Sequence, residues 1–488
     1  MVAVRASLQS CSTDEEFARA RFAHEERIMR VFVVTPIALA MLLLPGNARA
    51  DTLQEALAIA YQTNPSLTGA RAALRATDEG VPIALAAGRP TISATADYQE
   101  FLLRSANSFS APLRAANAGA NVSFPIYQGG RVRNSVKAAD ARVLAGRAIL
   151  RSTEADVFTA IVSVYMDVLR DTAIVELNNR NVAVLATNLE ASRDRFEVGD
   201  LTRTDVAQSE ARLQAAKGQL ELVRSQLDAS LENYLRFVGI PARDLEQPAE
   251  LQALPQTADD ALVVALDSNP QLEAAKADVV AARFDIKVAG ASRLPRLSAV
   301  ASGTYSNYLG TLGSTLPGRT FQQQQTAATI GLSASIPLYQ GGLPAAQVRR
   351  TQAVLGQTLE QEVFVERRIV ADTRAAFSRY RATQTVIVSA QAAVSANELA
   401  LEGVRAENSV GNRNVLDVLN AEQELLNSKV QLVTARRDAY VASFALLAAM
   451  GRAEARYLNL FGGPLFDPTQ RSSAVDTPNP DVEPKESQ

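Results

Sequence analysis

Cysteine and histidine, two residue types that often carry out chemistry in proteins, are nearly absent from this chain of 488 residues. Its one cysteine, Cys11, and its one histidine, His24, both precede an apolar run over residues 31–44. That run is typical of a secretory signal peptide, which we expect to start at Met29 and to be cleaved after Ala50. Because neither residue would remain after cleavage, we expect no disulfide, no metal bound by thiolate or imidazole and no Ser-His-Asp triad. We also expect no cofactor. The sequence also shows no phosphate-binding loop, so we predict that the protein is not an enzyme.

The polar residues with informative spacing lie at two places 212 residues apart, where a capping residue is followed three positions later by an acid: Thr202 with Asp205, and Asn414 with Asp417. Such pairs start helices, because the first side chain accepts from a free backbone N–H and the acid lies near the positive end of the helix dipole. A glycine precedes each pair, Gly199 and Gly411, and is expected to form a tight turn. The spacing therefore predicts two helical hairpins.

The same spacing belongs to a duplication of the chain. A Tyr-Gln-Gly-Gly motif at residues 127–130 returns at residues 339–342, again 212 residues later. Asn64-Pro65 returns as Asn269-Pro270, only 205 residues later, so seven residues are inserted between these two landmarks. We therefore predict two structural repeats, over residues 51–256 and 257–462.

Each repeat contains two segments in which apolar and polar residues alternate, which is the period of a strand. The four predicted strands are residues 91–102, 116–126, 297–308 and 327–338. Strands of ~11 residues match a tilted crossing of a bilayer, and this alternation is typical of outer-membrane barrels. The alternative is a soluble sheet with one dry face. Phe124, Tyr127 and Tyr339 at the strand ends would suit the aromatic belt of a membrane interface.

Long helices dominate the rest of both repeats. Residues 131–196 and 343–408 each predict a helix of about 66 residues, which at ~1.5 Å per residue spans ~100 Å. Apolar residues recur every seven positions in these helices and in those that follow, so we expect hairpins over residues 131–238 and 343–450 that pack as coiled coils. Residues 463–488 are polar and Pro-rich, and we expect a disordered tail.

Four strands cannot close into a barrel, and an open sheet edge in lipid leaves backbone groups unpaired. Closure must then be shared between copies of the chain: two copies supply eight strands, and three supply twelve. With 49 Lys and Arg against 52 Asp and Glu, the chain does not have the charge of a nucleic-acid-binding protein.

The sequence resembles the TolC-type outer-membrane efflux protein family. The resemblance rests on the repeated Asn-Pro and Tyr-Gln-Gly-Gly motifs, the prolines beside the strands and the Val-Gly turns. It implies a mainly α protein with β structure: a homotrimeric 12-stranded outer-membrane β-barrel, four strands per chain, continued into the periplasm by a long α-helical coiled-coil barrel. It also implies a passive exit duct for efflux or type I secretion that works with a periplasmic adaptor (membrane fusion) protein and an inner-membrane pump or secretion ATPase. The alternative function is a periplasmic coiled-coil structural or adaptor protein.

The resemblance further implies a periplasmic gate at the hairpin turns. Asp417 and Asn420 would line the constriction, and Arg413 would bond to the neighbouring hairpin near Thr204 and Asp205 to hold the closed state. The best-known member of the family has aspartate where this chain has Asn420, so only one acidic ring is expected here. Three Asp417 carboxylates around an axis would attract cations and repel one another.

The resemblance places the contact with the adaptor at the turn residues Val198, Gly199, Val410 and Gly411. The residue types near the turns are equally consistent with purely structural roles. Asp205 and Asp417 suit the first helical turn without any gate, and an exposed arginine such as Arg413 is most often simply solvated.

Overall fold

The computed structural model describes residues 52–103, 112–251, 254–313, 318, 320–458 and 466. The predicted signal region lies outside this part, as does the predicted tail apart from Phe466, whose backbone N–H donates to the Tyr61 hydroxyl at 3.2 Å. The first repeat contains α3 (Leu53–Thr63), α4 (Pro65–Asp78), α5 (Gly80–Ala86), β1 (Thr91–Glu100), β2 (Arg114–Tyr127), α6 (Arg131–Glu197) and α7 (Arg203–Val238). The second contains α8 (Ala258–Ser268), α9 (Pro270–Gly290), a short 3-10 helix η2 (Ala291–Arg293), β3 (Arg296–Asn307), β4 (Gln324–Ser335), α10 (Leu343–Ser409) and α11 (Val415–Ala449).

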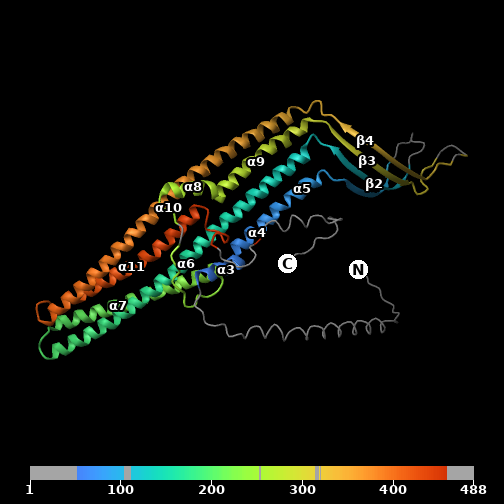
Figure 1. Ribbon diagram of the computed structural model, residues 1–488. Helices are drawn as coiled ribbons and strands as arrows, with labels where there is room; N and C mark the ends of the chain where they lie inside the picture. The colour runs from blue at the N-terminus through green and yellow to red at the C-terminus, as the bar shows by residue number, and fades with distance from the viewer. Residues whose placement is uncertain are drawn as a thin grey trace, which may run out of the picture. The chain divides into compact units, whose positions relative to one another are not determined.

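The long helices confirm the prediction from heptad spacing. α6 and α10 are each 67 residues long, and each reverses into a shorter antiparallel partner, α7 or α11 (Figure 1). Heptad residues such as Val143, Leu150, Leu213 and Leu432 are buried. α6 also contacts α9 and α11, so the two repeats pack side by side along their helices. No helix in the described part of the chain is both long and apolar enough to cross a membrane.

The two Asn-Pro motifs make the same contacts in both repeats. Asn64 caps α4 through its side-chain oxygen, and its Nδ2 donates to the carbonyl of Phe237 at the end of α7, at 2.9 Å. Asn269 does the same for α9, and its Nδ2 donates to the carbonyl of Ala449 at 3.1 Å. The proline that follows suits the first helical turn, where no backbone N–H is needed. Each asparagine therefore joins the start of the second helix of its repeat, α4 or α9, to the last turn of its hairpin, at the end of α7 or α11.

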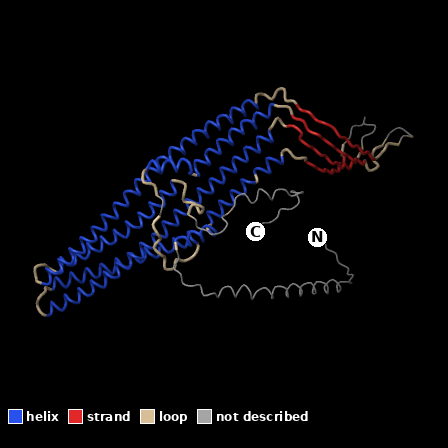
Figure 2. The backbone as a smooth tube through the Cα atoms, in the orientation of Figure 1, coloured by secondary structure: helices blue, strands red, loops and turns tan. Residues whose placement is uncertain are grey.

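The four strands form one antiparallel sheet in the order β1-β2-β3-β4, with the two repeats joined by β2 and β3 (Figure 2). The predicted bounds of the first three strands differ from the observed ones by two residues or fewer. β4 was placed wrongly, since residues 324–335 rather than 327–338 form it. Arg296 is the first residue of β3, directly after Pro295, and it pairs with Ser335. Because Pro295 cannot donate a hydrogen bond to the β-ladder, β4 has no pairing partner beyond Ser335.

At its other end, β4 begins three residues before the predicted start at residue 327. Gln324 and Gln325 pair with Asn307 and Ser306, so the last two of the four glutamines at residues 322–325 belong to the strand. The sheet is therefore longer at this end than alternation of side chains alone indicates.

Candidate functional site

The two hairpin turns have the same backbone geometry. Gly199 and Gly411 have φ angles of +88° and +80°, in the left-handed region that favours glycine. The N–H of Gly199 donates to the carbonyl of Phe196 at 3.0 Å, and that of Gly411 to the carbonyl of Asn408 at 3.1 Å. Val198 and Val410, just before the glycines, are exposed. The turns therefore present a small apolar tip on each hairpin.

Both predicted caps are present after the turns. The Thr202 hydroxyl accepts from the N–H of Asp205, and the Asp205 carboxylate accepts from the N–H of Thr202 at 2.9 Å. Asn414 and Asp417 form the same reciprocal pair, with 2.8 Å between the Asp417 nitrogen and Asn414 Oδ1. The hydrogen bond from the Thr202 hydroxyl, followed by that from its backbone, lowers the pKa of Asp205. Both carboxylates therefore have a structural role, whatever else they do.

Arg413 pairs within its own hairpin. Its Nε donates to Glu407 at 2.8 Å, and its Nη1 lies 4.0 Å from an Asp417 oxygen. The Glu407 carboxylate raises the pKa of Arg413. No bond from Arg413 to Thr204 or Asp205 is present within the described part of a single chain. A bond to these residues on an adjacent copy remains a prediction.

Asn420 faces the first hairpin of its own chain. Its Oδ1 accepts a hydrogen bond of 2.8 Å from Arg212 on α7. The side-chain amide of Asn420 is thus bonded to an arginine on the other hairpin. Sequence reasoning did not identify Arg212 as a partner.

A second contact between the hairpins was also missed, two residues further along α11. The Glu422 side chain is only 5 % exposed and accepts from Asn188 Nδ2 on α6, at 2.9 and 3.0 Å to its two oxygens, and from Arg405 Nη2 on α10 at 2.9 Å. Spacing could have indicated that Glu422 is buried, although not its partners, because Glu422 lies four residues after Val418 and three before Leu425, on the core face of the helix. A carboxylate on that face requires partners from neighbouring helices.

A third polar contact lies nearer the middle of the hairpins. Arg437 on α11 donates through Nη2 to Ser163 at 2.7 Å and to Asp167 at 3.2 Å, both on α6. The buried Asp171 of α6 accepts from Ser230 on α7 at 2.6 Å. Because these groups join three helices, they fix the hairpins relative to one another well away from the turns.

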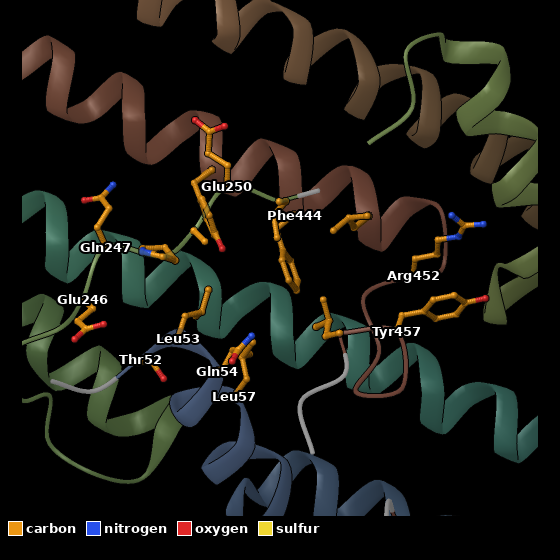
Figure 3. A pocket seen from close by; sticks show the side chains of 16 residues that line it. Thr52, Leu53, Gln54, Leu57, Glu246, Gln247, Glu250, Phe444, Arg452 and Tyr457 are labelled. Carbon is orange, nitrogen blue, oxygen red and sulfur yellow. The ribbon is translucent and has the colours of Figure 1, made fainter. Parts of the chain in front are cut away.

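The described residues include no group of His, Cys, Asp and Glu that could hold a metal ion. A cavity of about 760 Å³ lies away from the turns, between α3, α11 and residues 246–251 (Figure 3). Leu53, Leu57 and Phe444 contribute apolar surface to it, and Glu250 and Arg452 also line it. It contains none of the residues predicted for the gate.

Comparison with known proteins gives consistent matches. The sequence matches the family described as outer membrane efflux protein over residues 56–239 and 261–452, once for each repeat. It is 34 % identical to the outer membrane efflux protein BepC of Brucella suis, over 88 % of this chain and 91 % of BepC. It is 24 % identical to the outer membrane protein TolC of Vibrio cholerae, over 82 % of this chain and 91 % of that protein. The structure of the outer membrane protein VceC of Vibrio cholerae superposes with a TM-score of 0.69 at 22 % identity, over 82 % of this chain and 96 % of VceC.

Proposed function

The chain belongs to the outer membrane efflux protein family and is a channel protein of the outer membrane, and from this we propose that three copies form one closed duct from the periplasm to the exterior. Four strands per chain would give a barrel of twelve strands, and two hairpins per chain would give six around the helical part. The family match favours this duct over a periplasmic structural or adaptor protein.

The open sheet is the observation that carries the proposal. β1 and β4 each pair on one side only, and both are exposed along their whole length in a single chain. Ile92 and Ile330 are 77 % and 89 % exposed, so the sheet presents apolar side chains as well as free backbone groups. In a bilayer, unpaired backbone is costly and closed barrels avoid it. Pairing β4 of one copy with β1 of the next satisfies both edges.

We further propose that the hairpin turns form the periplasmic entrance, which is closed at rest. Asp417 and Asn420 lie close together on α11, and three copies would bring three of each around the axis. Arg413 would bond to Thr204 and Asp205 of the adjacent copy. The contacts of Asn420 with Arg212, and of Glu422 with Asn188, would hold the two hairpins of each chain together beside that ring.

The exposed turn residues Val198, Gly199, Val410 and Gly411 are proposed to contact a periplasmic adaptor, which links the duct to an inner-membrane pump or secretion ATPase. Glycine and valine present backbone groups and a small apolar surface, which suits docking of another helical tip. This assignment rests on the family resemblance and on the exposure of the two valines.

The proposal is tested with the full chain purified in detergent. Mass measurement should give three copies, and planar bilayers should show discrete channels. A monomer that needs no detergent and makes no channels would refute the duct. Crosslinking at position 199 with a photoreactive residue should capture a periplasmic adaptor. The identity of the captured complex would show whether the duct serves efflux or secretion. The control is the same photoreactive residue at position 102, beyond β1, which should capture no adaptor.

A further inference from the structure

Basic side chains gather where the four strands meet the helices. Residues 85–90, 127–137, 283–296 and 339–350 together contain ten Arg and Lys residues, all exposed, and one acidic residue, Asp285. We call these ten residues the junction belt. In contrast, the described strands and loops on the far side of the junction contain only Asp97, Glu100 and Arg114 as charged residues, and Arg114 pairs with Glu100 at 3.2 Å.

Side-chain contacts hold the four segments of the junction belt at one level. The Tyr-Gln-Gly-Gly glutamines do most of this: Gln128 Nε2 donates to the carbonyl of Ala87 at 3.2 Å, and Gln340 Nε2 donates to that of Ser292 at 3.4 Å. Two lysines, one on α6 and one on α9, lie over the ring of Phe284, at 5.5 and 5.0 Å from its centroid. Figure 2 shows the junctions side by side at the helical end of the sheet.

The chain does not neutralise this charge itself. Asp285 pairs with Arg142, outside the belt, and none of the ten belt residues forms an ion pair with another described residue. Two long helices, α6 and α10, also begin here without a side-chain cap and without an acid in the first turn. Their helix dipoles add further positive potential. The junction is therefore suited to anions from outside the chain.

A groove beside α6 shows what kind of anion would fit. It has a volume of about 620 Å³ and is lined by apolar residues of α5, β2 and α6, including Leu85, Ile126 and Val136. Arg133 and Lys137 line the same groove, together with one acid, Asp140. A free phosphate would gain nothing from the apolar lining. A phospholipid offers both an anionic phosphate and acyl chains.

We propose that the junction belt binds the phosphate groups of anionic phospholipids in the periplasmic leaflet of the outer membrane, and that the groove beside α6 takes an acyl chain of one such lipid. This inference rests on the proposed function, because it requires the sheet to lie in the membrane and the helices in the periplasm. The exposed Tyr127 and Tyr339 at the same level suit the headgroup region.

The test measures lipid retention by native mass spectrometry on the full chain in detergent, titrated separately with phosphatidylglycerol and phosphatidylethanolamine. We expect phosphatidylglycerol to be retained at least about fivefold more strongly, since each basic residue near an anionic surface contributes about that factor. The double variant Arg133→Gln/Lys137→Gln should lose most of this preference. The matched control Arg195→Gln/Lys217→Gln removes two exposed charges near the other end of the hairpin and should keep it.

Equal retention of the two lipids by the unmodified protein would overturn the proposal, and so would equal losses in both double variants. Loss of the preference on adding inorganic phosphate would assign the site to free phosphate instead. Bilayer conductance of the same samples separates the two levels of inference. Normal channels without lipid preference refute only the lipid site, whereas absent channels and absent trimers refute the duct.

Discussion

Replacing Glu422 by glutamine should favour opening of the channel. Glu422 is the acceptor for Asn188 on α6 and Arg405 on α10, so this one carboxylate bonds α11 to both long helices. Glutamine keeps the shape but removes the charge, and it turns one of the two acceptor oxygens into a donor that faces the Asn188 amide. Arg405 can still donate to the remaining oxygen.

The size of the effect follows from these contacts. A hydrogen bond to a charged group contributes about 1.5–3 kcal/mol, against about 1 kcal/mol for a neutral one. Arg405 is half exposed, with 52 % of its side chain accessible, so solvent screens its interaction with Glu422. We therefore use the lower end of the range for this hydrogen bond. We expect a loss of about 1–2 kcal/mol per chain, or roughly 5- to 30-fold in the equilibrium between joined and separated hairpins. If three chains open together, the free energies add to about 3–6 kcal/mol.

Single-channel recordings in planar bilayers measure this directly as conductance and open fraction. Glu424→Gln is the matched control, because Glu424 is two residues away on the same helix and exposed. The variant at 422 should raise the open fraction, and the control should not. An open fraction within about twofold of the unmodified protein would show that the contact contributes less than about 0.5 kcal/mol and does not hold the hairpins closed.

Three other changes test separate parts of the structure. Burial raises the pKa of Glu154 to about 7. As the pH rises from about 4 to 7, this carboxyl group ionises more readily in the unfolded chain than in the folded protein, so the free energy of unfolding should fall by at most about 3 kcal/mol. Glu154→Gln should make the melting temperature less dependent on pH over this range. Gly451→Ala should lower the free energy of unfolding by about 2–4 kcal/mol, because φ is +73° and the added Cβ would lie 2.6 Å from the carbonyl oxygen of Ser268. The control Gly218→Ala, in open space on a helix, should raise it by about 1 kcal/mol. Arg413→Ser should raise single-channel conductance by removing the proposed bond to the adjacent copy, and an unchanged value would count against that bond.

Local sequence predicted the helices and caps because local interactions determine them. Heptad spacing and the Thr202–Asp205 and Asn414–Asp417 pairs each depend on residues a few positions apart. The bounds of β4 were wrong for the opposite reason. Its last residue, Ser335, pairs with Arg296, which directly follows Pro295, 40 residues before that end. Pro337, inside the predicted segment 327–338, was a local signal against a strand that the prediction did not use. Alternation within β4 continues beyond that point and contains no information about its partner.

The contacts of Asn420 and Glu422 could not be predicted for a related reason. A heptad pattern shows which face of α11 is buried, but not which neighbouring helix lies opposite a given residue. Arg212 is 208 residues away from Asn420, and Asn188 is 234 residues away from Glu422. Their pairing depends on the rotation and height of α11 against the first hairpin, which several distant contacts set together.

The long helices of the two repeats differ in how much of their surface is buried, although both have the same heptad spacing. α6 and α10 have the same length, yet 21 residues of α6 are buried in a single chain and only six of α10. Phe364, Val388 and Leu399 of α10 are exposed apolar residues, unlike the surface expected of a finished coiled coil. Periodicity predicts that a helix packs against a partner, and it does so whether that partner belongs to the same chain or to another copy. α10 has a second apolar surface that its own chain leaves uncovered, which supports the proposal that an adjacent copy completes the helical wall as well as the sheet.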